Sequence, residues 1–334
     1  MDTKVLRQKV LDLAIRGKLV PQDPNDEPAS VLLERIRQQK QQMVKDGKLK
    51  AKDIKNDTII FVSEDNLHYE KFADGSVKCI EDEIPFELPD GWAWSRLGAV
   101  AEAIGDGDHQ PPPQTSFGVP FLVISNVSGG RLSFENTRFV SKEYFSQLPE
   151  TRKPRNGDLL FTVTGSYGIP VLIDSDDKFC FQRHIAIVRP CTISNRYLYV
   201  ILGSSYVKSI CDAKATGTAQ KTVGLATLRE LLIPVAPYKE QMQIYAQTQD
   251  ALSIVDSVSS DKEDLLNIIE SAKTKILDLA IRGQLVPQDP TDEPASVLLE
   301  RIRAEKEELI KQGKIKRDKK ESVIFRGEDN SYYL

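Results

Sequence analysis

The sequence has few of the residues from which disulfide frameworks and metal centres are built. Only four cysteines and three histidines occur among its 334 residues. The cysteines show no CxxC spacing, and the histidines stand far apart along the chain. A disulfide scaffold or a structural zinc site is therefore disfavoured, and a reducing cytoplasm is the compartment that fits the composition.

Long apolar runs are lacking as well. No stretch approaches the roughly 20 apolar residues that a membrane helix needs. The N-terminal segment MDTKVLRQKV has no apolar core of the kind found in signal peptides. We therefore expect a cytoplasmic protein that has no membrane partner.

Catalytic signatures are also missing. There is no tetrapeptide of the (D/N/S)PPY type, no glycine-rich cofactor fingerprint after a strand, and no GxxxxGK(S/T) segment for ATP. The segment GDGD at 105–108 is similar to the start of a calcium loop but lacks the remaining ligands. We expect no catalytic centre, no cofactor and no metal in this chain.

Positive charge is not in excess, because 45 Lys+Arg face 49 Asp+Glu. The balance is uneven, however: residues 88–235 hold 15 Lys+Arg and 13 Asp+Glu, and the remainder holds 30 and 36. A mildly basic middle with acidic flanks suits a DNA reader mounted on a scaffold. Chance variation explains so small a difference equally well.

What the sequence does contain is a long internal repeat. The segment LDLAIRGKLVPQDPNDEPASVLLERIR at 11–37 recurs at 277–303, an offset of 266 positions, with differences only at Lys18 and Asn25. We call these segments, with their flanking residues, the first copy and the second copy. The chain is thus one large unit followed by the start of another, which differs from a short-period solenoid.

Each copy predicts two short helices followed by a linker. Leu6, Val10 and Leu13 have helical spacing, and Gly17 stands where a helix would end shortly before a proline. PASVLLERIR then predicts a second helix with proline in its first turn. The lysine-rich tails KDGKLKAKDIKND and KQGKIKRDKKES are typical of exposed linkers.

The longest helical pattern precedes the second copy. Apolar residues follow alternating steps of four and three over about four heptads, interrupted at Lys262. This a/d stripe predicts a long helix that pairs in a coiled coil, and the alternative is an ordinary amphipathic helix on a globular core. The members of the stripe are Ala251, Val255, Val258, Leu265, Ile269, Ala272, Ile276 and Leu279.

The middle of the chain has a different pattern, with strand-like runs separated by turns such as SGG and RNGD. We predict an α+β fold: a helical fragment and linker at 1–87, a β-rich domain at 88–235, and the long helix with a second partial repeat at 236–334. The strand-like runs are 119–127, 158–164, 169–173 and 179–188.

Five blocks in this middle part carry a family resemblance. LPDGWAWSRLG, GDGDHQPP, GVPFLVISNV, NGDLLFTVTGSYG and ATGTAQKTVGLATLRELLIPVAPYKEQ occur in this order between residues 88 and 241. They look like successive blocks of a target recognition domain in the specificity (S) subunit of type I restriction–modification systems, HsdS. The two repeat copies and the long helix resemble that family's spacer regions, so the resemblance covers nearly the whole chain.

The resemblance implies a function. A usual S subunit has two recognition domains that each read half of a split DNA site, joined by two long antiparallel helices that bind methyltransferase (M) subunits. By resemblance, this chain would bind double-stranded DNA and M subunits, with a possible restriction (R) subunit. S-adenosylmethionine, ATP and Mg would then be held by those partner subunits.

This chain departs from the family pattern in one respect, because it has only one recognition domain and resembles a half subunit. A single domain reads a short half-site, and a lone helix would expose its a/d stripe to water. We therefore expect a homodimer that recognises a palindromic site with an unspecified central gap.

Several polar segments of the recognition domain could contact bases or phosphates. They lie on glycine-containing loops, at the end of a strand-like run, or, around Arg183, within an apolar run where a buried arginine would be costly unless paired. The candidate residues are His109, Gln110, Ser125, Asn126, Thr164, Ser166, Tyr167, Gln182, Arg183, His184, Lys214, Thr218, Gln220 and Lys221.

Most of these segments also have a plainer explanation. The loop at His109 could be an ordinary surface loop, and Ser125 with Asn126 could cap a turn. The segment 164–168 could be a tight hairpin, and the loop 214–221 could simply be solvated.

Three other functions stay open for the whole chain. It could be a regulatory or recombination-cassette fragment of an S subunit, a catalytic enzyme such as a fused nuclease, or a coiled-coil scaffold without a DNA role. The missing motifs count against the enzyme. Methylation assays with M subunits, cleavage assays with magnesium, and DNA binding across salt concentrations separate the three.

Overall fold

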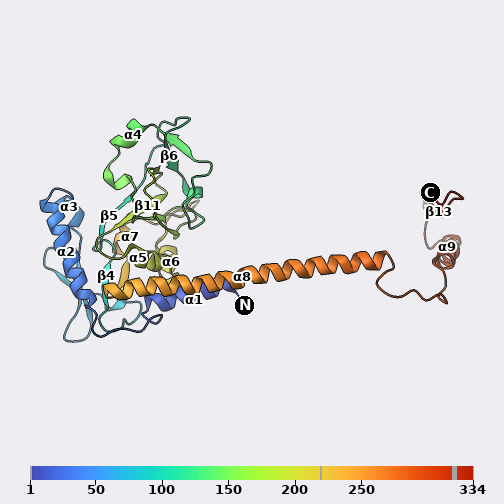
Figure 1. Ribbon diagram of the computed structural model, residues 1–334, viewed down its shortest axis with the longest axis horizontal. Helices are drawn as coiled ribbons and strands as arrows, with labels where there is room; N and C mark the ends of the chain where they lie inside the picture. Colours follow the sequence, from blue (N-terminus) through green and yellow to red (C-terminus); the bar gives the residue numbers. More distant parts are fainter. Residues whose placement is uncertain (1, 219, 318–321, 334) are drawn as a thin grey trace. The chain divides into compact units, whose positions relative to one another are not determined.

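The computed structural model describes residues 2–218, 220–317 and 322–333 (Figure 1). Contacts divide the chain into two compact units, 1–262 and 263–334, which we call the N-terminal unit and the C-terminal unit. Helices and strands both contribute substantially, so the predicted α+β fold class is confirmed.

The helices before residue 238 are α1 Thr3–Ile15, α2 Ala29–Lys45, α3 Ala51–Ile54, α4 Lys142–Gln147, α5 Asn195–Leu202, α6 Ser205–Lys214 and α7 Leu225–Glu230, with 3₁₀ turns η1 Glu81–Glu83, η2 Ile124–Asn126 and η3 Glu150–Arg152. Of these helices, α1, α4, α5 and α6 begin with a side-chain cap, whereas α2, α3 and α7 do not. Asp2 accepts a hydrogen bond from the backbone of Lys4 to begin the first helix, and Gly17, at φ +63°, follows its end.

The strands of this unit form small sheets in the orders β1-β2-β3, β12-β4, β10-β6-β7 and β5-β11-β8-β9. The last of these is central, because β11 is buried between β5 and β8 and pairs antiparallel with both. The strands are β1 Ile59–Val62, β2 His68–Lys71, β3 Val77–Cys79, β4 Ala93–Arg96, β5 Ala101–Asp106, β6 Val119–Leu122, β7 Arg138–Val140, β8 Leu159–Thr162, β9 Pro170–Leu172, β10 Cys180–Phe181, β11 Ile185–Pro190 and β12 Leu232–Val235.

One hydrophobic core joins the first copy to the middle of the chain. Leu32 and Ile36 of α2 are each 1% exposed and share this core with Leu97 and Tyr197. The core also includes Ile244 from the start of the long helix. Residues 1–87 and 88–235 therefore pack as one body. The predicted division of the chain at residues 87 and 235 stays a prediction about which part has which role.

Two predicted strands are interrupted. The run 119–127 is a strand only as far as Leu122, because Asn126 accepts a hydrogen bond from the backbone of Val123 at 2.9 Å and closes the turn η2. The run 179–188 divides at 182–184 into β10 and β11, which belong to different sheets.

The first lysine-rich tail is more ordered than its composition predicts. It contains the short helix α3, and its Asp57 pairs at 2.6 Å with Lys40, a lysine only 2% exposed. The Lys40 ammonium also donates to the carbonyl oxygen of Gly98 at 2.9 Å, which explains how a buried lysine is tolerated. The second lysine-rich tail lies partly outside the described residues.

The long helix α8, Tyr238–Ile281, has 44 residues and begins before the predicted stripe. Val255 is buried within the N-terminal unit, with Ala251 and Val258 half-buried, so this part follows the globular alternative. The rest of the stripe is exposed or, at Leu279, half-exposed. Within the described residues, no helix is long and apolar enough to cross a membrane.

The C-terminal unit repeats features of the first copy. Its elements after α8 are helix α9 Ala295–Lys311 and the paired strands β13 Phe325–Arg326 and β14 Tyr332–Tyr333. Phe325 stacks on Tyr333 at 5.8 Å between ring centroids, as Phe61 stacks on Tyr69 at 6.0 Å in the first copy. The second copy is thus similar to the first in structure beyond the identical segment.

A buried ion pair yields a stability prediction. Arg189 of β11 binds Asp158 at the start of β8 through two hydrogen bonds of 2.9 and 2.8 Å, and both side chains are buried. Asp158→Asn keeps the shape but leaves the guanidinium charge unpaired, so we expect a loss on the order of 3–5 kcal/mol. The control Glu27→Gln, which breaks the exposed pair with Arg35, should cost less than about 1 kcal/mol. Urea unfolding followed by near-UV circular dichroism measures both, and equal costs would contradict the prediction.

Candidate nucleic-acid interface

Three strands of the central sheet, β5, β8 and β11, have one end each at the same edge of the sheet. Ala186 pairs with Asp106 at the end of β5, and Ile185 pairs with Thr162 at the end of β8. The loops that follow β5 and β8 and the loop that precedes β11 therefore start side by side. We call this the loop edge and assign to it residues 107–118, 163–169, 182–184, 214–218 and 220–222.

The first of these loops is attached directly to the segment before β11. The backbone of Asp108 donates to Phe181 at 2.9 Å, and the backbone of Arg183 donates to Asp108 at 3.0 Å. A Cβ atom at Gly107 would stand 1.9 Å from the Phe181 carbonyl oxygen, so only glycine permits this approach. His109 and the Gln182–His184 segment are thereby brought together from sequence positions more than 70 residues apart.

The hairpin between β8 and β9 lies against the loop that follows α6. Gly165 donates to the carbonyl oxygen of Lys221 at 3.1 Å, and the hydroxyl of Thr222 donates to Thr164 at 3.2 Å. The backbone of Val163 also donates to His184 at 3.0 Å. The hairpin expected as the plainer explanation is therefore present, and it stands beside two other candidate segments.

The neighbouring residues Ser125 and Asn126 have different surroundings in the structure. The η2 turn is close to the loop edge, because Gln182 donates from its backbone to Leu122 at 3.1 Å. Ser125 is exposed, whereas Asn126 is 4% exposed and donates its amide to Glu135 at 3.1 Å. Since its amide oxygen is also occupied within the turn, Asn126 matches the turn-capping explanation.

The loop edge carries exposed cations. Arg183, Lys214 and Lys221 are exposed, and within 2–218, 220–317 and 322–333 no carboxylate forms an ion pair with any of them. Gln110, Ser166, Thr218 and Gln220 are exposed as well. Unpaired cations among hydrogen-bonding groups favour a negatively charged partner.

Sequence reasoning missed Lys208, which belongs to the same surface. Its ammonium lies 3.9 Å from the ring centroid of Tyr167, and it pairs at 3.0 Å with Asp212. Asp212 accepts a hydrogen bond from the Tyr167 hydroxyl at 2.8 Å, which raises the pKa of Tyr167 and keeps the phenol protonated. No spacing signal links Lys208 to a tyrosine 41 residues earlier, so only the fold could reveal it.

The two histidines of the loop edge differ in their surroundings. His109 is exposed, and its ring nitrogen lies 2.8 Å from a carboxylate oxygen of Asp106. Burial, helped by the neighbouring charge of Arg183, lowers the pKa of His184. His184 is therefore neutral at pH 7 and can both donate and accept hydrogen bonds.

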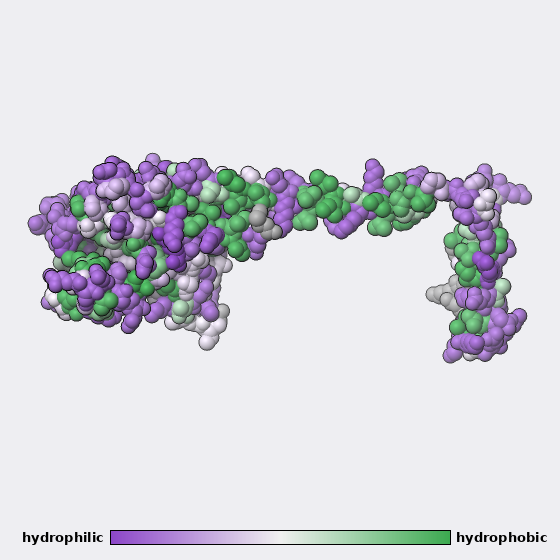
Figure 2. Space-filling model, turned by 90° about the horizontal axis from the view of Figure 1, so that it is seen from below, coloured by the Kyte–Doolittle hydropathy of each residue, from purple (hydrophilic) through white to green (hydrophobic). Residues whose placement is uncertain are grey.

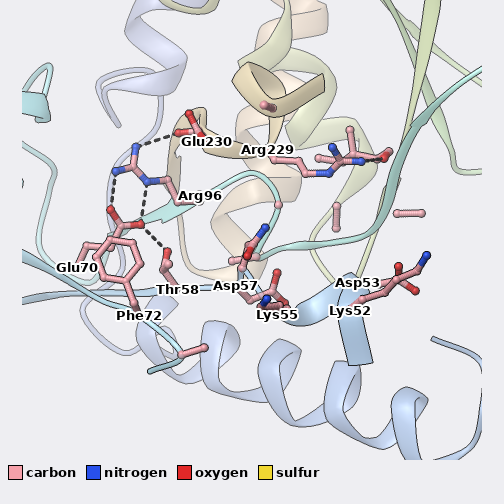
Figure 3. A pocket seen from close by; sticks show the side chains of 18 of the residues that line it. Lys52, Asp53, Lys55, Asp57, Thr58, Glu70, Phe72, Arg96, Arg229 and Glu230 are labelled. Carbon is pink, nitrogen blue, oxygen red and sulfur yellow. Dashed lines mark hydrogen bonds and ion pairs between the residues drawn. The ribbon is translucent and has the colours of Figure 1, made fainter. Parts of the chain in front are cut away.

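A cavity of the N-terminal unit lies away from the loop edge. About 880 Å³ in volume, it is lined by residues around Gly98 and the start of β5, at the end of that strand opposite to the loop edge. Figure 3 shows Arg96 in its wall, held by Glu70 and by the carbonyl oxygen of Glu230. Burial raises the pKa of Glu70, but hydrogen bonds from Arg96 and Thr58 outweigh it, so the pKa is lowered. These charges neutralise each other, which suits a structural network better than an anion site.

Metal ligands do not gather at the loop edge. Asp106 and Asp108 of the GDGD segment pair with His109 and Arg152 respectively. Across the described part of the chain, no group of three or more His, Cys, Asp or Glu side chains is placed to hold a metal ion.

A loop-built, exposed surface with unpaired cations on a β-rich scaffold is the geometry of a module that binds a polar, anionic macromolecule. The chain belongs to the type I restriction–modification DNA specificity family, because that family's domain model matches residues 89–267, more than half of the sequence. The matched segment covers the whole loop edge.

The chain is also similar to individual proteins and to a solved structure. The specificity subunits of the type I restriction enzymes EcoAI and EcoEI from Escherichia coli are 32% and 30% identical to this sequence, each over 95% of this chain. A crystal structure of the HsdS subunit from Thermoanaerobacter tengcongensis superposes with a TM-score of 0.45 at 21% identity, over 77% of this chain and 57% of that one. The present chain spans 58% and 57% of the lengths of the two E. coli relatives.

The close approach at Gly107 yields a prediction. Gly107→Ala would push a methyl group into the backbone at Phe181, so we expect a loss of about 1–3 kcal/mol and displacement of the His109 loop. The control Gly129→Ala, which has no atom within 4 Å of the added Cβ, should change stability by less than about 0.5 kcal/mol. Urea midpoints and amide NMR shifts of 107–110 and 181–184 check this, and equal behaviour of the two variants would count against the described loop contact.

Proposed function

We propose that this chain reads DNA sequence through the loop edge, as a non-catalytic specificity subunit of a type I restriction–modification complex. One observation carries the proposal: four polar loops, far apart in sequence, converge on one edge of the central sheet, inside the segment that matches the DNA specificity family. A surface assembled from loops on a rigid sheet can vary its base contacts without altering the scaffold.

The loop edge offers two kinds of contact. Lys214 and Lys221, with Thr218 and Gln220 between them, suit phosphate oxygens because they combine positive charge with hydroxyl and amide donors. Arg183 suits guanine through a bidentate contact, and Gln182 suits adenine. In this proposal, the 214–221 loop positions the chain on the backbone while the 182–184 segment reads bases.

Several side chains take supporting roles in the proposal. His109, Gln110 and Ser125 flank the 182–184 segment, and neutral His184 can serve as donor or acceptor toward a base edge. Ser166 stands exposed on the hairpin, whereas Thr164 is buried and Tyr167 is held by Asp212, so the latter two act in shaping the hairpin. Asn126 takes no part in base reading in this proposal.

The partners follow from the family. We propose that the chain pairs with a second copy, that the pair reads a two-fold symmetric site with a gap, and that methyltransferase subunits carry S-adenosylmethionine and the chemistry. A restriction subunit would supply the ATP- and Mg-dependent steps. A bacterial cytoplasm is the compartment in which such a complex meets DNA.

The phosphate-binding loop yields a prediction. Replacing Lys214 and Lys221 together by Ala should weaken binding to all DNA sequences about equally and lower the log–log salt slope by about two units, one per lost contact. The control replaces Lys45 and Lys48, exposed lysines at the end of α2. Fluorescence anisotropy across salt concentrations measures both. A slope unchanged in the Lys214/Lys221 variant would remove this loop from the interface.

The base-reading segment yields a second, contrasting prediction. Gln182→Ala should alter the preferred bases, with a change of about 1–3 kcal/mol at one position of the half-site. Asn126→Ala should instead lower stability by about 1–3 kcal/mol, because buried turn groups lose partners, while the base preference stays the same. Selection of bound sequences from a random library measures preference. The assignment fails if Asn126→Ala shifts preference and Gln182→Ala does not.

A further inference from the structure

The two repeat copies have the same residues at the positions that are buried in the first copy, but these positions are not buried in the second copy. In the first copy, the two positions at which the copies differ, Lys18 and Asn25, are both exposed. All buried residues of 11–37 are therefore identical in the second copy. They are Leu11, Ala14, Ile15, Gly17, Val20, Ala29, Leu32 and Ile36, and their counterparts are Leu277, Ala280, Ile281, Gly283, Val286, Ala295, Leu298 and Ile302.

The counterparts are exposed in the C-terminal unit. Leu298 is 45% and Ile302 is 49% exposed, whereas Leu32 and Ile36 are each 1% exposed. Figure 2 shows apolar surface in patches along the second part of α8 and in the C-terminal unit. The second copy thus carries a complete docking face whose matching surface is known, because the first copy occupies that surface in the N-terminal unit.

The polar contacts of the first copy can also be made by the second. Gln22 donates to Glu240 at 3.2 Å, and Lys239 pairs with Asp26 at 3.2 Å. The guanidinium of Arg16 lies 4.3 Å from the ring centroid of Phe86. The counterparts Gln288, Asp292 and Arg282 are the same residue types.

The first helix shows how the counterpart segment would lie. Helix α1 runs antiparallel along α8, with Thr3 3.4 Å from Ser259 and Arg7 paired with Asp256 (Figure 1). By the repeat offset, α1 corresponds to 269–281, the end of α8 itself. The contacts of α1 are therefore a template for an antiparallel pair of α8 helices from two chains.

We propose that two copies of this chain exchange their repeat segments. The second copy of each chain docks on the partner's N-terminal unit in place of the partner's own α1 and α2. This exchange deepens the dimer part of the proposed function and rests on it, while it is independent of how the loop edge reads DNA. The occupant of the exposed docking face is thus a second copy of this chain.

The register of the exchanged pair follows from the template. Position 269 lies beside Ser259 of the partner, and Lys273, which takes the place of Arg7, pairs with Asp256 of the partner. Because the same contacts repeat in the other direction, the two-fold axis crosses midway between 259 and 269, near Asp264. Leu265, 58% exposed in the single chain, then approaches its own counterpart across the axis.

The seam around the axis supplies the driving force. Each N-terminal unit holds one copy before and after exchange, so the exchange itself alters apolar burial little. The exchanged pair additionally covers Leu265, Leu266 and Ile268, which α1 cannot reach because it begins at the position equivalent to 269. Exchange of identical elements is a low-cost route to a dimer for this reason.

Matched substitutions in the two copies provide the first test. Leu298→Asp with Ile302→Asp should leave a folded monomer, because the exchanging face is lost. Leu32→Asp with Ile36→Asp should leave a folded dimer whose dissociation constant is roughly tenfold or more below that of the unchanged chain, because the resident copy no longer competes. Gel filtration with light scattering over a concentration series measures both. A monomeric or aggregated Leu32/Ile36 variant beside an unaffected Leu298/Ile302 variant would overturn the exchange.

Cysteine cross-linking tests the register without disturbing the core. In a Cys79→Ser background, which removes an exposed thiol, Ser259→Cys with Ile269→Cys should form a covalent dimer on oxidation. Ser259→Cys with Ser271→Cys, two residues further round the helix, should not. Ser259→Cys with Thr3→Cys should form an internal disulfide that blocks dimerisation. Equal cross-linking by the 269 and 271 pairs, or a disulfide-locked chain that dimerises normally, would contradict the proposal.

DNA binding separates this inference from the proposed function. The Leu298/Ile302 variant should bind a single half-site as tightly as the unchanged chain and lose at least tenfold of its affinity for the complete two-fold site. If dimerisation by exchange is not observed but the chain still binds a half-site, the proposed DNA-reading function stands and the exchange is refuted. Absence of DNA binding in a chain that cross-links through 259 and 269 instead refutes the proposed function and keeps the exchange.

Discussion

The register of β11 between β5 and β8 determines where the candidate DNA-contacting loops start. A slip of one residue would turn every side chain of this buried strand to the opposite face, so the core specifies the register strongly. The Arg189–Asp158 pair fastens one end of β11 to β8. At the other end, Ile185 and Ala186 align the exits of β8 and β5. The position of the loop edge is therefore a consequence of buried contacts within the central sheet.

The sequence predicts the parts of this arrangement better than their assembly. Apolar runs and turn residues located β8, β9 and the helices of the two copies, because each depends on local periodicity. The run 179–188 was predicted as one strand, and the cost of burying Arg183 indicated only a polar contact there, not the break at 182–184 that the structure shows. The role of Asn126 could not be decided, because an asparagine that caps a turn and one that reads adenine look alike in sequence. Lys208 could not be found, because its partner Tyr167 is adjacent only in the fold.

The a/d stripe illustrates a different limit. Periodicity predicted a helix with an apolar stripe, and the structure contains that helix. The first part of the stripe is packed in the N-terminal unit, however, and the rest is mostly exposed. Val255 is buried in the N-terminal unit, whereas Leu265 and Ile269 are exposed. A heptad pattern records which side of a helix is apolar and not what covers it. The clue to a covering partner comes from α1, which corresponds in sequence to the end of α8 and lies against α8 at Asp256 and Ser259.

In the proposed function, the repeat and the loop edge both contribute to reading a two-part DNA site. Under this proposal, a single set of loops reads a short DNA segment, and a longer site needs a second set at a defined distance and orientation. A helix of 44 residues spans roughly 65 Å at 1.5 Å per residue, so an antiparallel pair centred near Asp264 would separate two loop edges by a rigid spacer. Two-fold symmetry would then turn the spacer length into the gap between half-sites. In such a complex, exposed loops would determine which bases are recognised. The buried residues that the two copies share would hold the paired helices in register and so determine the gap.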